Sequence, residues 1–247
     1  MKVPHISTIE FTNACNFSCS YCQRYHEVGK RPIGMLDINL VKLMVQNGDF
    51  ENTMFCEFQQ NGEPTIHPKF EEIARLIKSV VPMIGMSTNG TFHKFKHFQG
   101  KKIDYLDTVT ISIHSETTEE DIDKTIAMLE NCKIRIQTLD KYIYDLNIEK
   151  YRNVDGIFID NYDIRDFDKI YKSPKFCLDV ISSCTIQWDG TLCLAAIQLV
   201  NKKFMVIYSI THFKIFGQVL IRECLIFVIH AIHHLRSLRD LIFYQTL

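Results

Sequence analysis

Hydrophobic residues along the chain recur in two alternating patterns, one with the two-residue period of a β-strand and one with the period of a helix. Six short runs fit strands, at residues 5–12, 53–60, 82–88, 107–114, 133–139 and 154–160. Between them, apolar residues spaced along one helix face predict helices that begin near Asp37, Pro68 and Thr117. This alternation predicts a parallel sheet with right-handed crossovers. Polar residues that follow the strands are therefore expected along one rim of the sheet.

The first strand leads directly into a CxxxCxxC segment. Its residues are Cys15-Asn16-Phe17-Ser18-Cys19-Ser20-Tyr21-Cys22. Three thiols this close together can surround one compact inorganic centre, and in a four-iron cluster they leave one iron without a protein ligand. A substrate or cofactor can bind at that iron. His26 leaves an alternative open, because Cys15, Cys19, Cys22 and His26 could also close a structural zinc site.

Charge and composition narrow the classes of partner and compartment. The 247 residues include 28 basic and 29 acidic ones, which does not favour a nucleic acid or an anionic membrane as partner. Nine cysteines without an apolar leader in front of them predict a reducing, cytoplasmic location, where clustered thiols bind metals. The longest apolar-rich region, residues 204–232, is interrupted by charged residues, so no membrane span is expected.

The cysteine segment, with Tyr21 directly before its last cysteine, resembles the CxxxCxφC motif of the radical S-adenosylmethionine (radical SAM) superfamily, in which φ is aromatic. Two further motifs follow in that family's order. The segment Asn61-Gly62-Glu63-Pro64 after the second strand resembles the GGEP motif, with Asn61 at the first glycine. The segment Ser87-Thr88-Asn89-Gly90 resembles the TNG signature at the end of the third strand. As isolated motifs, both segments are also ordinary turns.

The resemblance implies an α/β fold, a partial (β/α)6 TIM-like barrel with a small C-terminal extension, in which Cys15, Cys19 and Cys22 are catalytic and ligate a [4Fe-4S] cluster. The residues implied to bind S-adenosylmethionine are Tyr21, Asn61, Gly62, Glu63, Pro64, Ser87, Asn89, Ser112 and His114. The NGEP turn would hold the methionyl amino group, Asn89 and its turn the carboxylate, and the fourth strand the ribose. Arg135 and Gln137 on the fifth strand are further polar candidates.

Gly62 gives a test that separates cofactor from cluster. A turn that brings backbone acceptors against an ammonium leaves no room for a Cβ. We therefore expect Gly62→Val to weaken S-adenosylmethionine binding. Because the three cysteines lie on another loop, the cluster content is expected to stay largely intact.

The chain is expected to divide into a core barrel (1–165), a hairpin segment (166–200) and a helical tail (201–247). In the second segment, Asp189-Gly190 lies between two β-rich arms and predicts a β-hairpin. This hairpin resembles SPASM and twitch extensions, which implies that Cys177, Cys184 and Cys193 hold an auxiliary iron–sulfur cluster. A plain hairpin with buried thiols is the alternative. Residues 198–247 fit either a helical cap or an altered extension.

The predicted function is therefore that of a radical SAM enzyme. Its cluster would cleave S-adenosylmethionine reductively, and the 5'-deoxyadenosyl radical would abstract a hydrogen atom from a substrate. The substrate is expected to be a peptide, a protein or a small molecule, and an electron donor such as flavodoxin or ferredoxin is required. Two alternatives are a glycyl-radical-enzyme activase and a non-enzymatic, zinc-stabilised interaction module.

Overall fold

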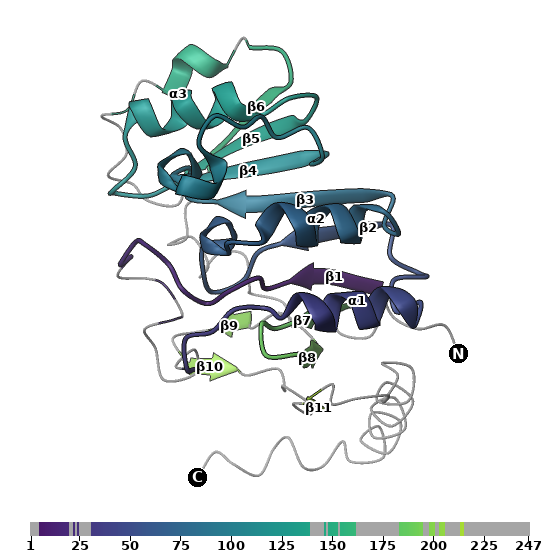
Figure 1. Ribbon diagram of the computed structural model, residues 1–247. Coiled ribbons are helices and arrows are strands. Elements are labelled where there is room, and N and C mark those ends of the chain that lie inside the picture. The colour runs from purple at the N-terminus through teal and green to yellow at the C-terminus, as the bar shows by residue number, and fades with distance from the viewer. Residues whose placement is uncertain are drawn as a thin grey trace.

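The computed structural model describes residues 5–19, 22, 24, 31–138, 146, 148–152, 154–161, 183–194, 198–200, 203–205 and 213–214. All six predicted strands are present. They are β1 (His5–Ile9), β2 (Phe55–Phe58), β3 (Met83–Thr88), β4 (Thr108–Ile113), β5 (Lys133–Thr138) and β6 (Ile157–Asn161). Each strand pairs in parallel with the next, in the order β1-β2-β3-β4-β5-β6 (Figure 1). A parallel sheet that winds in one direction is typical of a β/α barrel, and the predicted α/β fold is confirmed.

Three helices connect the strands and cover one face of the sheet (Figure 1). They are α1 (Ile38–Gln46), α2 (Phe70–Lys78) and α3 (Glu119–Met128). Asp37 caps α1, since its side chain accepts a hydrogen bond from the backbone of Asn39. Thr118 and Asp121 form a capping box at the start of α3, one residue from the predicted start near Thr117. Short 3-10 turns lie at η3 (Pro64–Ile66), η4 (Phe92–Lys94), η5 (Lys96–Phe98) and η7 (Ile148–Tyr151).

The alternation along β4 shows how the sequence orients the sheet. Val109, Ile111 and Ile113 are buried in the core that the helices cover. Thr110 and Ser112 lie on the opposite face and are partly exposed. We call this opposite face of the sheet the inner face. Polar side chains of the inner face are therefore free to serve a site instead of the core.

The C-terminal hairpin joins the same sheet. It consists of β7 (Ser183–Ile186) and β8 (Thr191–Leu194), and its Gly190 has φ 79°, as the Asp-Gly turn predicts. Strand β7 pairs in parallel with the free side of β1, so the full order is β11-β8-β7-β1-β2-β3-β4-β5-β6. The segment expected as a separate unit thus extends the barrel sheet next to the strand that delivers the cysteines.

The described residues beyond the hairpin are in short strands. They are β9 (Gln198–Val200), β10 (Lys203–Met205) and β11 (Phe213–Lys214). Two of them fall within the tail expected to be helical, so that expectation is wrong for these residues, and the rest of 201–247 lies outside the described residues. Each helix that the structure describes is too short or too polar to span a membrane.

Candidate functional site

The cysteine loop is closed at its base by contacts between its two ends. The backbone N–H of Leu36 donates to the carbonyl of Phe11 at 2.8 Å, and Thr12 forms a bridge with Met35. Asn13 secures both sides, because its side chain donates to the carbonyl of Pro32 and accepts from the backbone of Gly34, each at 2.9 Å. These contacts hold the loop at the carboxyl end of β1.

Cys15, Cys19 and Cys22 lie on this loop with partly exposed side chains, and none of the three is in a disulfide. The backbone N–H of Phe17 points at the Cys15 sulfur at 3.5 Å, and the N–H of Cys22 donates to the carbonyl of Cys19 at 3.0 Å. Burial raises the pKa of Cys15 to about 11, while the Phe17 hydrogen bond and the charge of Arg24 act in the opposite direction. Thiolate ligation by Cys15 must therefore release a proton.

The donor set suits an iron–sulfur cluster in its chemistry, since it consists of three accessible thiols near a cation. Arg24 donates to the carbonyls of Asn13 and Phe17, both at 3.3 Å, and so lies inside the loop. Within the part of the chain that the structure describes, no three His, Cys, Asp or Glu side chains form a site for a single metal ion. His26, which the zinc alternative requires, and Tyr21 lie outside the described residues.

Glu63 ties the NGEP turn to the end of β3. It is 2% exposed, and its carboxylate accepts hydrogen bonds from the Thr65 hydroxyl at 2.5 Å, the Thr88 hydroxyl at 2.8 Å and the Asn89 backbone N–H at 2.7 Å. Burial raises the pKa of Glu63, and these hydrogen bonds oppose that effect. Both carboxylate oxygens are engaged inside the protein. Pro64, also buried, follows as the first residue of η3.

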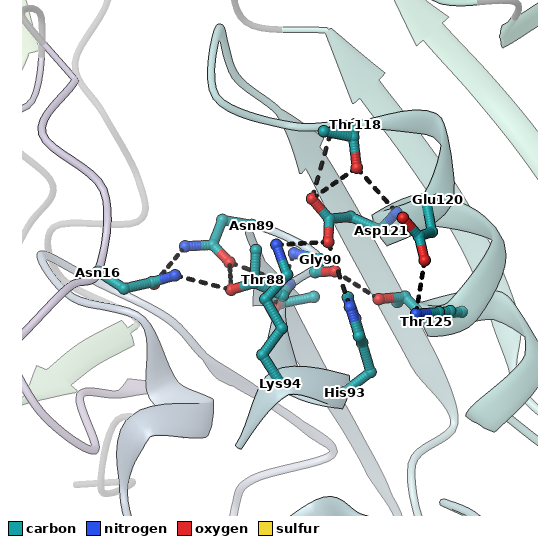
Figure 2. A network of polar contacts seen from close by, with 12 residues as sticks. Asn16, Thr88, Asn89, Gly90, His93, Lys94, Thr118, Glu120, Asp121 and Thr125 are labelled. Atoms are coloured by element: carbon teal, nitrogen blue, oxygen red, sulfur yellow. Dashed lines mark hydrogen bonds and ion pairs between the residues drawn. The ribbon is translucent and has the colours of Figure 1, made fainter.

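Asn89 lies in the turn after β3 and connects that turn to the cysteine loop (Figure 2). Its side-chain NH2 donates to Asn16 at 2.8 Å and lies 3.9 Å from the Cys15 sulfur. Its side-chain oxygen accepts from the Thr91 hydroxyl at 2.6 Å, and Asn16 completes the ring by donating to that hydroxyl at 2.9 Å. The Thr125 hydroxyl donates to the carbonyl of Gly90 at 2.6 Å, which connects this turn to α3.

Gly62 lies directly against the start of the cysteine loop. A Cβ on Gly62 would overlap the backbone carbonyl oxygens of Thr12 and Ala14. The next residue, Glu63, donates its backbone N–H to the Ala14 carbonyl at 2.8 Å. The cysteines do lie on a different loop from Gly62, but the two loops are packed against each other, so this separation does not protect the cluster in Gly62→Val.

The remaining predicted residues lie on the inner face of β3 and β4 or directly after the carboxyl end of β4. His114 follows β4, and its Nδ1 lies 3.5 Å from the Cys19 sulfur, so the ring contacts the cysteine loop. Ser112 pairs in register with Gln137 of β5. The Ser87 hydroxyl of β3 donates to the Glu57 carboxylate of the neighbouring strand β2 at 2.7 Å. The structure thus brings His114 to the cysteines and leaves Ser87 and Ser112 lower on the strands.

Glu10, which was not among the site residues expected from the sequence, directly follows β1 and is 1% exposed. Its carboxylate accepts from Arg31 at 2.6 Å and from the backbone N–H groups of Asn61 at 3.3 Å and Trp188 at 3.2 Å. Glu10 therefore joins the cysteine loop, the NGEP turn and the C-terminal hairpin. The available signal was a charged residue in the predicted first strand (5–12), directly between the apolar residues Ile9 and Phe11.

Of the three cysteines expected to hold an auxiliary cluster, the structure describes Cys184 and the backbone of Cys193, which lie on the two strands of the hairpin. Cys184 is 1% exposed and belongs to the hydrophobic core next to β1. Cys193 pairs in register with Thr185, whereas Cys184 pairs with Leu194. Cys177 lies outside the described residues.

A parallel sheet whose strands are joined by helices, with a three-cysteine loop at the carboxyl end of its first strand, defines a class of α/β protein that can hold a metal cofactor, and the family comparison identifies it. The radical SAM superfamily model matches residues 9–171, about two thirds of the chain. The chain belongs to the radical SAM superfamily. This assignment confirms the family resemblance of the three sequence motifs.

Three curated relatives are similar over parts of the chain. The first is a "Putative glycyl-radical enzyme activating enzyme" of Methanocaldococcus jannaschii, 29% identical over 71% of this chain. The second is a "Probable GTP 3',8-cyclase" of Sulfolobus acidocaldarius, 34% identical over 43% of the chain. The third is a "Tungsten-containing aldehyde ferredoxin oxidoreductase cofactor-modifying protein" of Pyrococcus furiosus, 33% identical over 34% of the chain. The chain spans 66%, 33% and 23% of the lengths of these relatives, respectively.

Proposed function

We propose that this chain is a radical SAM enzyme in which Cys15, Cys19 and Cys22 hold a [4Fe-4S] cluster and the fourth iron binds S-adenosylmethionine. When bound, the cluster supplies the electron that breaks a sulfonium carbon–sulfur bond, and the 5'-deoxyadenosyl radical then removes a hydrogen atom from the substrate. The observation that carries the proposal is the set of three accessible thiols on one loop, closed at its base and packed against both other family motifs.

The chain's own residues divide into those that face the cofactor and those that hold them. The backbone of Asn61 and Gly62 and the ring of His114 border the cysteine loop, and we assign the cofactor contacts to them. Glu63 and Asn89 are positioning residues in this proposal, because their side chains are already engaged by neighbouring protein groups. Tyr21 and Pro64 remain predicted neighbours of the cofactor.

The test is anaerobic reconstitution with iron and sulfide, followed by iron counting, electron paramagnetic resonance (EPR) and measurement of 5'-deoxyadenosine after reduction. Replacing Cys15, Cys19 or Cys22 by Ala is expected to abolish both the cluster and 5'-deoxyadenosine formation. Cys132→Ala is the matched control, since Cys132 is another partly buried free thiol but precedes β5 at the opposite end of the strand. His26→Ala is expected to keep the cluster. A colourless protein that binds zinc through all four residues would disprove the proposal.

Iron beyond one cluster would depend on Cys177, Cys184 and Cys193. Cys184 is buried in the hydrophobic core, where a metal cluster could reach its sulfur only if the core packing were disrupted. Its burial therefore favours a packing role over metal ligation. We therefore infer that Cys184 is not a ligand. Cys184→Ala should leave the iron content unchanged, and a drop in iron per chain with the first cluster intact would show an auxiliary site.

The substrate class is a peptide, protein or small molecule. One observation favours a glycyl-radical-enzyme activase as a second candidate, because the relative with that name matches the longest part of the chain among the three relatives above. Incubation with reductant, S-adenosylmethionine and a candidate glycyl-radical enzyme should then produce a protein-centred EPR signal. A flavodoxin or ferredoxin is the expected electron donor, and the free thiols favour a reducing, cytoplasmic location.

A further inference from the structure

The orientation of the Asn89 side-chain amide is fixed by a neighbour that can only donate. The backbone N–H of Thr91 lies 3.2 Å from the side-chain oxygen of Asn89. A backbone N–H has no acceptor capacity, so the amide oxygen must face Thr91 and the NH2 group must face the other way. That other side holds the side chain of Asn16 and the sulfur of Cys15.

The NH2 group of Asn89 is buried at this point. Asn89 is 4% exposed, and one of its N–H bonds is used by the Asn16 oxygen at 2.8 Å. The Cys15 sulfur, 3.9 Å from the same nitrogen, is the partner that remains for its second N–H. Cys15 also receives the Phe17 N–H at 3.5 Å, so two donors converge on this sulfur.

We propose that Asn89 tunes the cluster, because its side-chain N–H donates to the Cys15 sulfur and raises the reduction potential. The inference rests on the proposed function, in which Cys15 is a cluster ligand. Hydrogen bonds to ligating sulfurs are among the main determinants of the potential of an iron–sulfur cluster. Reduction adds negative charge that spreads onto the sulfurs, and a buried N–H dipole stabilises that charge with little screening by water.

Asn16 supplies a matched control on the same ring of contacts. Its side chain accepts from Asn89 (Figure 2) and donates to the Thr91 hydroxyl. Asn16 directly follows Cys15 in the sequence. Asn16→Ala removes these contacts and loosens the loop, but it leaves the Asn89 N–H and the Cys15 sulfur in the protein. Asn89→Ala removes the donor itself. The pair of variants therefore separates donation to sulfur from the position of the loop.

The experiment is a redox titration of the reconstituted full chain followed by EPR, for the parent protein, Asn89→Ala and Asn16→Ala. Iron content and S-adenosylmethionine-induced spectral changes are measured first, so that a parent without a cluster would refute the proposed function and not this inference alone. Asn89→Ala is expected to shift the midpoint potential to more negative values, and Asn16→Ala is expected to shift it much less. Should Asn89→Ala hold no cluster, Asn89→Ser replaces it, since a Ser hydroxyl can still accept from the Thr91 backbone N–H as in an ST-turn, adds no charge beside the cluster and has no N–H for the Cys15 sulfur.

An Asn89 variant with a full cluster and the parent potential would overturn the inference. An equal shift in Asn16→Ala and Asn89→Ala would also overturn it, because the effect would then arise from the position of the loop. A negative shift confined to the Asn89 variant would support donation to sulfur.

Discussion

The carboxylate of Glu63 accepts a hydrogen bond from the backbone N–H of Asn89 at 2.7 Å, which joins the turn after β2 to the turn after β3. Asn89 in turn bonds to Asn16 on the cysteine loop at 2.8 Å. The three family motifs are therefore one connected polar structure, in which each turn is held by the next. A change in any of them should therefore alter the position of the cysteine loop.

Glu63 gives the first prediction. In Glu63→Gln, one carboxylate oxygen becomes an NH2 group, which must face a backbone N–H of either Asn89 or Thr65. A buried donor left without an acceptor costs about 1 to 3 kcal/mol, so the free energy of unfolding of the apoprotein should fall by roughly that amount. Urea unfolding measures the loss. The control is Glu57→Gln, because position 57 is only partly buried and the Gln side-chain oxygen can still accept from Ser87. An equal loss in the control would contradict the prediction.

Gly62 gives a prediction in which the structure changes one expectation from the sequence, namely that the cluster content would stay largely intact. Gly62→Ala places a methyl group against the carbonyl oxygens of Thr12 and Ala14, just before Cys15. The cysteine loop must move, so we expect a lower iron content after reconstitution as well as weaker S-adenosylmethionine binding. Asn61→Ala is the control, because it keeps the backbone N–H that donates to Glu10. A Gly62→Ala protein with full iron content would show that the loop adapts without loss.

The Glu10–Arg31 ion pair should matter far more for stability than the ion pairs on the surface. The side chain of Glu10 is 1% exposed and that of Arg31 is 16% exposed. Glu10→Gln leaves the guanidinium without its charged partner, which for a buried pair costs about 3 to 5 kcal/mol. Asp104→Asn breaks the Arg75–Asp104 pair, whose side chains are 49% and 54% exposed, and should cost about 1 kcal/mol or less.

Chemical denaturation of both variants compares these costs. Glu10→Gln should also lower the iron content, because the Glu10–Arg31 contact joins the residue before the cysteine loop to the segment that follows it. Equal stability losses in the two variants would contradict the assignment of Glu10 as the joint between the loop, the turn and the hairpin.

Asp121 should make the stability of the fold depend on pH in the acid range. Burial would raise the pKa of its carboxyl, but Lys94 and Thr118 outweigh that effect and hold the pKa below its ordinary value (Figure 2). A lowered pKa in the folded state stabilises the protein above the ordinary Asp pKa of about 4, and this contribution is lost as the pH falls through the folded-state value. Asp121→Asn should remove this acid-dependent part and cost about 1 kcal/mol at neutral pH through the capping box.

Urea unfolding from neutral pH to below about pH 4 measures this effect, since the contribution is lost between the ordinary Asp pKa and the lower folded-state value. Thr118→Ser keeps the capping hydroxyl and should retain the pH dependence of the parent. An Asp121→Asn protein with the parent's pH dependence would assign that dependence to other carboxylates.

The sequence by itself determined the features that depend on a few neighbouring residues. The alternation of Val109, Ile111 and Ile113 fixed the buried face of β4, and the Thr118–Asp121 pair fixed the start of α3. Asp189-Gly190 fixed the hairpin turn in the same way. Such signals are local because side-chain period, capping and turn geometry act over a single turn or strand. The parallel order of the strands then followed from the alternation of strands and helices.

Only the tertiary structure decided which polar groups of the three motifs are engaged by other parts of the protein. Glu63 and Asn89 are separated by 26 residues, Asn16 and Asn89 by 73, and Glu10 and Trp188 by 178. A buried carboxylate or amide must satisfy its hydrogen bonds with whatever the fold brings near, and no local pattern encodes that partner. The same reason explains why β7 beside β1 and the contact of Gly62 with the cysteine loop became apparent only in three dimensions.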